Sequence, residues 1–269
     1  MWWLNDPSAT LGLTERIAAI GVVIGSLELL ARPRALGERG MLSWPVARLR
    51  SPALAVGRSG DLLDHFFNPP RVYALCVVRA LSGILIVATP SSSVVSVCAL
   101  VIAAVSSLLL MLRTSYGNDG ADQMMLSVLL PAALARLVNH PQAIEYALWF
   151  IALQCCLSYL TSGIGKLRGS SWRDGSGLIG VLNTRTYGIQ NMARFFERHR
   201  GLAVLLSWII ILTEVTFPIV LVVPASWIPF ILAGGLGFHF ANAVVMGLNA
   251  FVWAFGAAYP ALAYVALGK

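Results

Sequence analysis

The chain alternates between long apolar segments and shorter polar ones over nearly its whole length. Apolar runs of roughly 18 residues or more recur, and each is long enough to cross a hydrocarbon core of about 30 Å. A lipid-spanning chain must form a helix bundle or a closed barrel, and continuous apolar runs favour helices. The sequence therefore predicts an all-α integral membrane protein. We expect a bundle of about eight transmembrane helices, over residues 17–36, 71–89, 92–112, 121–138, 143–165, 202–223, 227–246 and 250–267.

Composition supports the membrane class. Hydrophobic residues make up 58% of the chain, charged residues 12%, and the mean hydropathy is +0.76. These values lie outside the range of a soluble globular domain. Outside the spans, residues 41–50 and 61–67 have the pattern of short amphipathic pieces that lie at the membrane surface.

Positive charge is distributed unevenly between the predicted loops. If the N-terminus is outside, alternation places loops 37–70, 113–120 and 166–201 on the cytoplasmic side. These loops and their flanks carry fifteen Lys and Arg residues, while the opposite side carries three. Such a bias is the positive-inside pattern. We expect a multi-pass protein of the cytoplasmic (plasma) membrane, and the net charge of +7 then reflects topology, not a nucleic-acid partner.

One lysine, Lys166, stands apart from the other basic residues. The chain has nineteen Lys and Arg residues, and the only other lysine is the last residue, Lys269. Arginine stays charged at physiological pH, whereas a desolvated lysine can lose its proton and act as a base. Lys166, at the end of the fifth predicted span, is therefore a candidate base. The alternative is a lysine whose stem lies along apolar surface while its charge reaches the interface.

Several polar residues fall inside predicted spans, where they are costly and usually face a cavity or a partner. Glu214 lies near the middle of the sixth span. His239 and Asn242 are three residues apart and share one helix face. Asp122 opens the fourth helix, where an acidic residue suits the helix dipole. Each is a candidate site residue, or a partner in an interhelical hydrogen bond that holds the bundle together.

Other familiar motifs carry less information. The four histidines have no metal-ligand spacing, so no metal site is expected. The four cysteines form no C-x-x-C pair, which favours packing over thiol chemistry. The run Gly175–Gly180 matches a dinucleotide fingerprint, but it follows a membrane helix and not a strand.

Two runs resemble one known family. The segment Ser162-Gly-Ile-Gly-Lys-Leu-Arg-Gly-Ser-Ser-Trp-Arg-Asp-Gly175 resembles the vitamin K-dependent γ-carboxylase superfamily, whose membrane part is the HTTM domain. There a helix ends in Ala-Gly, followed by Lys-Leu and then a Trp and a Gly. The run Gly237–Phe251, with Tyr259-Pro-Ala-Leu262, resembles that family's Phe-His…Asn…Gly…Phe…Pro-Leu run. In size, the chain is closest to the bacterial sporulation-delaying-protein B-like members.

The resemblance implies an organisation and a chemistry. Residues 1–60 would form an extra N-terminal transmembrane helix with an interfacial loop, and residues 61–269 an HTTM-like transmembrane domain. In the family, the motif lysine deprotonates reduced vitamin K, and oxygenation then generates a base that removes a γ-proton from a peptide glutamate, to which CO2 adds. Carried over, the cofactor would be a reduced quinone and no metal. The implied catalytic residues are Lys166 and His239, and the implied substrate cavity contains Asn242, Glu214, Asp122 and Trp172.

The chain also departs from the family. It ends at Lys269, where the carboxylase has a large soluble domain, and Asp119 or Asp122 stands where the family has a histidine. We therefore expect a quinol-coupled membrane enzyme or maturation factor that modifies a secreted peptide or a lipid-soluble substrate, with carboxylase-like lyase or oxidoreductase chemistry left open. Membrane lipid and a protein that supplies substrate binding would be its partners. The alternative is a non-catalytic quinone- or lipid-binding subunit of a membrane complex.

Overall fold

The computed structural model describes residues 6–37, 40, 42–50, 57–113, 120–185 and 188–268. Asp119 lies outside these ranges. The described residues form helices and connecting turns and contain no strand. The long helices are α1 (Pro7–Ala31), α6 (Arg71–Ala88), α7 (Val94–Arg113), α8 (Gly120–Val138), α9 (Pro141–Arg168), α13 (Arg200–Thr216), α14 (Ile228–Met246) and α15 (Asn249–Leu267).

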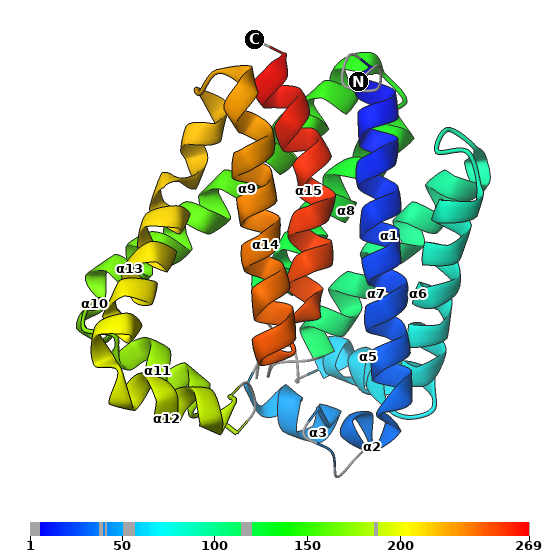
Figure 1. Ribbon diagram of the computed structural model, residues 1–269. Coiled ribbons are helices and arrows are strands. Elements are labelled where there is room, and N and C mark those ends of the chain that lie inside the picture. Colours follow the sequence, from blue (N-terminus) through cyan, green and yellow to red (C-terminus); the bar gives the residue numbers. More distant parts are fainter. Residues whose placement is uncertain are drawn as a thin grey trace.

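Seven helices in the described part of the chain are long and apolar enough to cross a membrane: α6, α7, α8, α9, α13 with the 3-10 turn that follows it, α14 with the turn before it, and α15. This confirms an all-α, multi-pass membrane bundle. The helix α1 is not among the seven, and it carries Glu15, Arg16 and Glu28. It nevertheless has 25 residues and runs beside the spans over the height of the bundle (Figure 1).

The boundaries of α1 differ from the predicted range 17–36. The helix begins at Pro7, because the Asp6 side chain accepts a hydrogen bond from the Ser8 backbone N–H and caps the first turn. It ends at Ala31, because Pro33 cannot donate a backbone hydrogen bond and restricts the residue before it. The polar residues at its start are therefore helical, which the apolar pattern alone did not predict.

The segments between α1 and α6 and between α9 and α13 carry most of the arginines. They lie toward one end of the bundle, which we call the arginine-rich end (Figure 1). Both chain termini lie at the other end, so the helices traverse the bundle an even number of times when α1 is counted. Within the two segments predicted as amphipathic pieces, residues 44–50 and 61–67 are helical. The short helices at the arginine-rich end are α2 (Pro33–Leu36), α3 (Trp44–Ala47) with η2 (Arg48–Arg50), α5 (Gly57–Phe67), α11 (Ser176–Leu182) and α12 (Gln190–Arg198).

Arg113, the last residue of α7, connects three separate segments at the arginine-rich end of the bundle. Its side chain is fully buried and donates hydrogen bonds to three backbone carbonyls: Leu36 at 2.7 Å, Leu42 at 2.7 Å and Phe67 at 3.1 Å. A buried guanidinium needs several acceptors, and helix ends leave carbonyls without partners. One side chain thus joins α7 to the ends of α2 and α5 and to the turn between α2 and α3.

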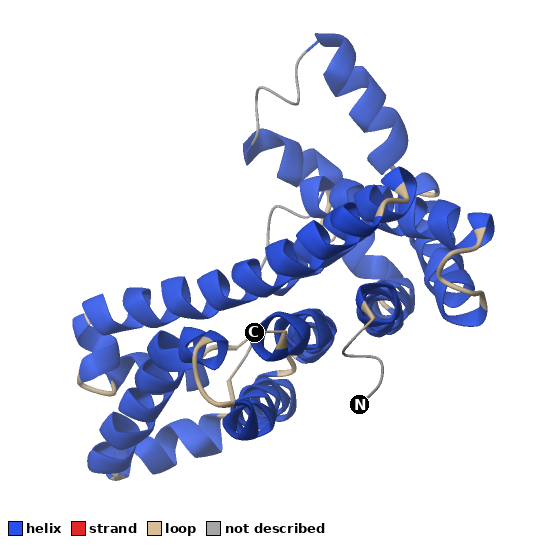
Figure 2. Cartoon of the chain, turned by 90° about the horizontal axis from the view of Figure 1, so that it is seen from above, coloured by secondary structure: helices blue, strands red, loops and turns tan. Residues whose placement is uncertain are grey.

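The helix α15 lies at the centre of the molecule. Seen from above, its C-terminal end is near the middle of the helices (Figure 2), and it is the most deeply buried of the seven spans, whereas α14 is the least buried. One apolar core joins it to α1, α8 and α9, with Ala18, Val22, Ala258 and Leu262 among its members. The helix α1 is thus packed into the bundle.

A buried ion pair holds α1 to α8 near the end where both termini lie. Arg136 Nε lies 2.7 Å from Glu15 Oε1, and both side chains are almost completely buried. Arg136 also donates to the Ser8 hydroxyl at 2.9 Å. Arg136, which lies inside the fourth predicted span, is therefore neutralised within the bundle by Glu15, a residue just before the first predicted span.

Candidate functional site

A cavity of about 600 Å³ lies between the C-terminal halves of α9, α13 and α14 and the N-terminal half of α15. Five of the six candidate residues from the sequence line it, although they come from four separate helices. The helix α10 (Ser170–Arg173) contributes the tryptophan. These five are Lys166, Trp172, Glu214, His239 and Asn242. Most of the remaining wall is apolar, with Phe238, Phe251 and Phe255 among its residues.

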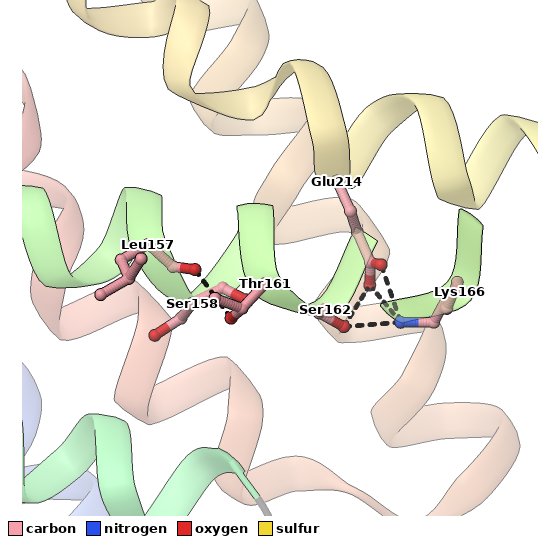
Figure 3. A network of polar contacts seen from close by, with 6 residues as sticks. All are labelled: Leu157, Ser158, Thr161, Ser162, Lys166 and Glu214. Atoms are coloured by element: carbon pink, nitrogen blue, oxygen red, sulfur yellow. Dashed lines mark hydrogen bonds and ion pairs between the residues drawn. The ribbon is translucent and has the colours of Figure 1, made fainter. Parts of the chain in front are cut away.

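Lys166 and Glu214 form an ion pair in the cavity wall (Figure 3). Lys166 Nζ lies 2.7 Å from Glu214 Oε2 and 2.8 Å from Oε1, so the ammonium contacts both carboxylate oxygens. The Ser162 hydroxyl, one turn before Lys166, accepts from Nζ at 2.6 Å and donates to Glu214 Oε1 at 3.3 Å. The side chains of Glu214 and Lys166 are only 5% and 18% exposed. The lysine therefore turns inward and does not reach for the interface.

Local sequence explains why these two helices meet at the pair. Gly163 faces α13, and a Cβ there would lie 2.7 Å from the Val215 backbone nitrogen and 2.9 Å from Glu214 Cβ. Only a glycine permits this approach. Both charged residues also lie near the C-terminal ends of their helices, where the helix dipole favours a cation and disfavours an anion. Lys166 thus compensates a carboxylate that α13 alone would hold poorly.

Trp172 closes the cavity beside the pair. Lys166 Nζ lies 5.2 Å from the centre of the Trp172 ring, within cation–π range. The turn that follows is fixed by Asp174, which accepts from the Ser176 backbone N–H at 2.8 Å. Outside the spans, the hydrogen bonds from Ser176 lower the pKa of the Asp174 carboxyl, so that it stays an acceptor. The short helices α10 and α11 thereby hold one side of the cavity wall next to Lys166.

His239 takes part in a hydrogen-bonded chain with two tyrosines. Its Nε2 lies 2.7 Å from the Tyr159 hydroxyl, which lies 2.7 Å from the Tyr259 hydroxyl. The His239 ring stacks on Phe255, with centroids 4.2 Å apart. His239 is 3% exposed, and its Nδ1 has no hydrogen-bond partner among the described residues.

Three amide side chains add hydrogen-bonding capacity to the wall. These are Gln123, Gln154 and Asn242. Each can both donate and accept. Asn242 lies one helical turn after His239 on α14, as their spacing predicted. A ligand with a polar head and an apolar body would find matching groups in this cavity. Within the described ranges, no cluster of three His, Cys, Asp or Glu side chains suited to a metal ion is present.

Asp122 does not line this cavity. Gly120 and Gln123 of the same helix do, and they share a face because they are three residues apart. Asp122 is turned from that face and interacts electrostatically with Arg79 of α6. Arg79 in turn donates to the hydroxyls of Ser107 and Ser26. The structure therefore places Asp122 away from the cavity wall, where its charge acts on Arg79.

Sequence analysis did not identify Ser162, Tyr159 or Tyr259 as site residues. Ser162 and Tyr159 lie four and seven residues before Lys166, the spacing that puts side chains on one helix face. That spacing could have identified both as candidate site residues. Tyr259 belongs to another helix and has no such signal.

Comparison of the chain with protein-family models, with curated proteins and with solved structures finds no match. The resemblance of the two motif runs to the carboxylase superfamily therefore stays a prediction. What the geometry establishes is a largely apolar cavity lined by a paired lysine and carboxylate, the His239 imidazole and three amides. These groups can hold an amphiphile and exchange a proton with it.

Proposed function

We propose that this protein is a quinol-coupled membrane enzyme or maturation factor, and that the Lys166–Glu214 pair accepts a proton from the quinol. The observation that supports this most directly is that the pair forms part of the wall of a largely apolar cavity. Ion pairs that serve only packing have no need of a cavity beside them. Trp172 and Phe251 offer flat surfaces for a ring, and the amides offer partners for its oxygens.

The ion pair gives the proton a route. Lys166 Nζ can accept a proton only after it has passed one of its own to Glu214, which lies 2.7 Å away. Ser162 holds Nζ in place during this exchange, since it contacts both partners. After the transfer the pair carries one positive charge, which the quinolate beside it balances, so that the site together with its ligand gains no net charge in the bilayer. A bound quinol would supply the phenolic proton to the pair and, on oxidation to the quinone, two electrons to dioxygen.

A test uses duroquinol, a short quinol without a tail, and the purified protein in lipid nanodiscs. We expect the wild-type protein to oxidise duroquinol with dioxygen, and Lys166→Arg to lower the rate by about 100-fold. Arg168→Lys, two residues on and exposed, is the matched control and should keep the wild-type rate. Unchanged oxidation by Lys166→Arg would overturn the role of the lysine as base.

The second candidate is a non-catalytic subunit that binds quinone or lipid. The observation in its favour is that both Glu214 oxygens contact Lys166, which is also what a purely structural tie between α9 and α13 would show. Mass spectrometry of the extracted lipids separates the two ideas. A stoichiometric quinone together with absent duroquinol oxidation in the wild type would favour the subunit.

We further propose that the arginine-rich end of the bundle lies in the cytoplasm of a plasma membrane and that the N-terminus lies outside. A protein partner would then present the peptide or lipid-soluble substrate to the cavity. A membrane-impermeant maleimide tests the orientation on intact cells, with one cysteine added at a time to a Cys98→Ala background whose other cysteines are buried. Ser92→Cys, between α6 and α7, should react, and Asn183→Cys, after α11, should not. The reverse pattern would overturn the orientation.

A further inference from the structure

The long helices around the cavity pack against one another on every side except one. The helix α13 packs against α9, α9 against α15, and α15 against α14. In the described part of the chain, α13 and α14 do not pack along each other, although both line the cavity. Figure 1 shows these two helices leaning apart from the turns that join them, η3 (Phe217–Leu221) and η4 (Ala225–Trp227). The cavity therefore has a side that no helix–helix contact closes.

Apolar packing closes this gap at both of its ends. Toward the arginine-rich end, Leu206 of α13 and Val245 of α14 pack against one apolar cluster, which α11, α12 and the first turn of α13 form. At the opposite end, Phe217 and Ile228, on either side of the connecting turns, belong to the main core. Between these two contacts the gap is a window in the side of the bundle, which we call the lateral mouth.

Helical periodicity identifies the edge that α14 contributes. Val245 marks the face of α14 that points toward α13, and Ala241, Phe238 and Gly234 precede it on the same face at helical spacing. Phe238 lines the cavity, whereas Ala241 and Gly234 are exposed. A Cβ at Gly234 would meet nothing within 4 Å. The α14 edge of the lateral mouth thus consists of small residues with open space in front of them.

Ile210 forms the edge on α13. It follows Leu206 by one helical turn and lines the cavity. Large apolar side chains surround the lateral mouth on the outside, where Ile209 is 51% and Phe240 62% exposed. Both edges also lie within segments that are apolar enough to cross a membrane. The lateral mouth therefore faces the hydrocarbon of the bilayer and not water.

We propose that the ligand enters the cavity sideways from the bilayer through the lateral mouth, and that Ala241 and Gly234 leave room there for its apolar chain. Glu214 lies one turn after Ile210, so a polar head inside the mouth is within reach of the ion pair with Lys166. The chain would pass between Ile210 and Ala241 into the lipid. The ligand class that fits is an amphiphile with a compact polar head and a long apolar chain. The inference rests on the proposed function for the identity of that head, a quinol.

Site-directed spin labelling tests the lateral mouth without any ligand. A nitroxide is attached to Ala241→Cys in a Cys98→Ala background, whose other cysteines are buried, and the protein is placed in lipid nanodiscs. We expect the label to collide more with dioxygen, which dissolves in lipid, than with nickel ethylenediaminediacetate, which stays in water. Ala233→Cys is the matched control, since it is exposed on the outward face of α14 that Phe240 shares, and should give the same ratio. Collision of the Ala241→Cys label mainly with the nickel chelate would overturn the inference.

A second test uses decyltrimethylbenzoquinol, in which a decyl chain replaces one methyl group of duroquinol. The phenyl ring of Ala241→Phe would fill the space that the chain needs. We expect this variant to raise the KM for the decyl quinol by about 10-fold and that for duroquinol, which has no chain, by about 2-fold at most. Ala233→Phe makes the same change on the outward face and should keep both values.

An unchanged KM for the decyl quinol in Ala241→Phe would overturn the inference and leave the proposed role of Lys166 standing. If the wild type oxidises neither quinol, the proposed function fails, and the collision ratio of the spin label alone decides whether the lateral mouth opens to lipid.

Discussion

Lys166 and Glu214 are 48 residues apart in the chain, yet Lys166 Nζ lies within 2.8 Å of both Glu214 carboxylate oxygens. Each residue would be costly in the bilayer alone, and together they are neutral. The pair lies in the wall of the 600 Å³ cavity and not in the packed interior of the bundle. Its contribution to stability and its contribution to chemistry can therefore be separated by mutation.

Lys166→Met should destabilise the protein by about 3–5 kcal/mol, because it leaves the Glu214 carboxylate buried without a partner. The double variant Lys166→Met with Glu214→Leu should recover most of this loss, because no charge remains to be buried. Thermal unfolding in detergent measures both effects. The double variant should still fail to oxidise duroquinol. Recovery of activity together with stability would show that the pair is only structural.

Gly163→Ala should separate α9 from α13. The new methyl group would lie 2.7 Å from the Val215 backbone nitrogen, and a backbone neighbour cannot move as a flexible side chain does. Overpacking of this kind costs about 1–3 kcal/mol. We expect a lower unfolding temperature and weakened duroquinol oxidation.

Gly165→Ala is the matched control for this change. It lies in the same turn of α9, and a Cβ there would meet nothing within 4 Å. It should keep or slightly raise the stability, since alanine favours a helix. Equal effects of the two alanines would contradict the close approach at Gly163.

Glu15→Gln should weaken the attachment of α1. The change leaves the Arg136 guanidinium buried beside a neutral amide, where it has lost its counter-charge at 2.7 Å. Removing one partner of a buried pair costs about 3–5 kcal/mol. Limited proteolysis and thermal unfolding would show the loss, and Glu145→Gln, an exposed glutamate near the same end, should leave both unchanged.

Arg113→Met should loosen the arginine-rich end of the bundle. Three backbone carbonyls, of Leu36, Leu42 and Phe67, would lose a charged donor at once. Hydrogen bonds to charged groups contribute about 1.5–3 kcal/mol each, so we expect a loss of at least that of one bond. Arg113→Lys should be intermediate, because an ammonium cannot reach three separated carbonyls. Hydrogen exchange in α2 and α5 measures the effect, and the exposed Arg34→Met should cause none.

The spans could be predicted from sequence because each is a local property. A run such as 94–112 is apolar enough by itself to require burial in lipid, and its helix follows since no other structure satisfies its backbone there. The start of α1 could not be predicted in this way. Glu15 and Arg16 made that segment polar, and only the contact of Glu15 with Arg136 shows why it is still buried.

The candidate site was predicted in part. Lys166, Glu214, His239 and Asn242 were identified because polar residues in lipid are rare and expensive. The same criterion selected Asp122, which the structure places outside the cavity wall, because cost in lipid does not say which neighbour a residue faces. Tyr159 and Tyr259 escaped notice, since a tyrosine in a span is unremarkable until its hydroxyl is seen between partners.

The sequence by itself determined that this is a membrane bundle, where most of its spans lie, and which of its polar residues need a partner. Hydropathy and helical periodicity act over one segment at a time, so a linear chain can specify them. Only the tertiary structure decided that Lys166 meets Glu214, that Asp122 lies off the cavity wall, and that His239 is left with one unsatisfied ring nitrogen. Such pairings depend on how helices pack and rotate against each other, and small residues such as Gly163 and Gly235 set those distances through contacts far away in the sequence.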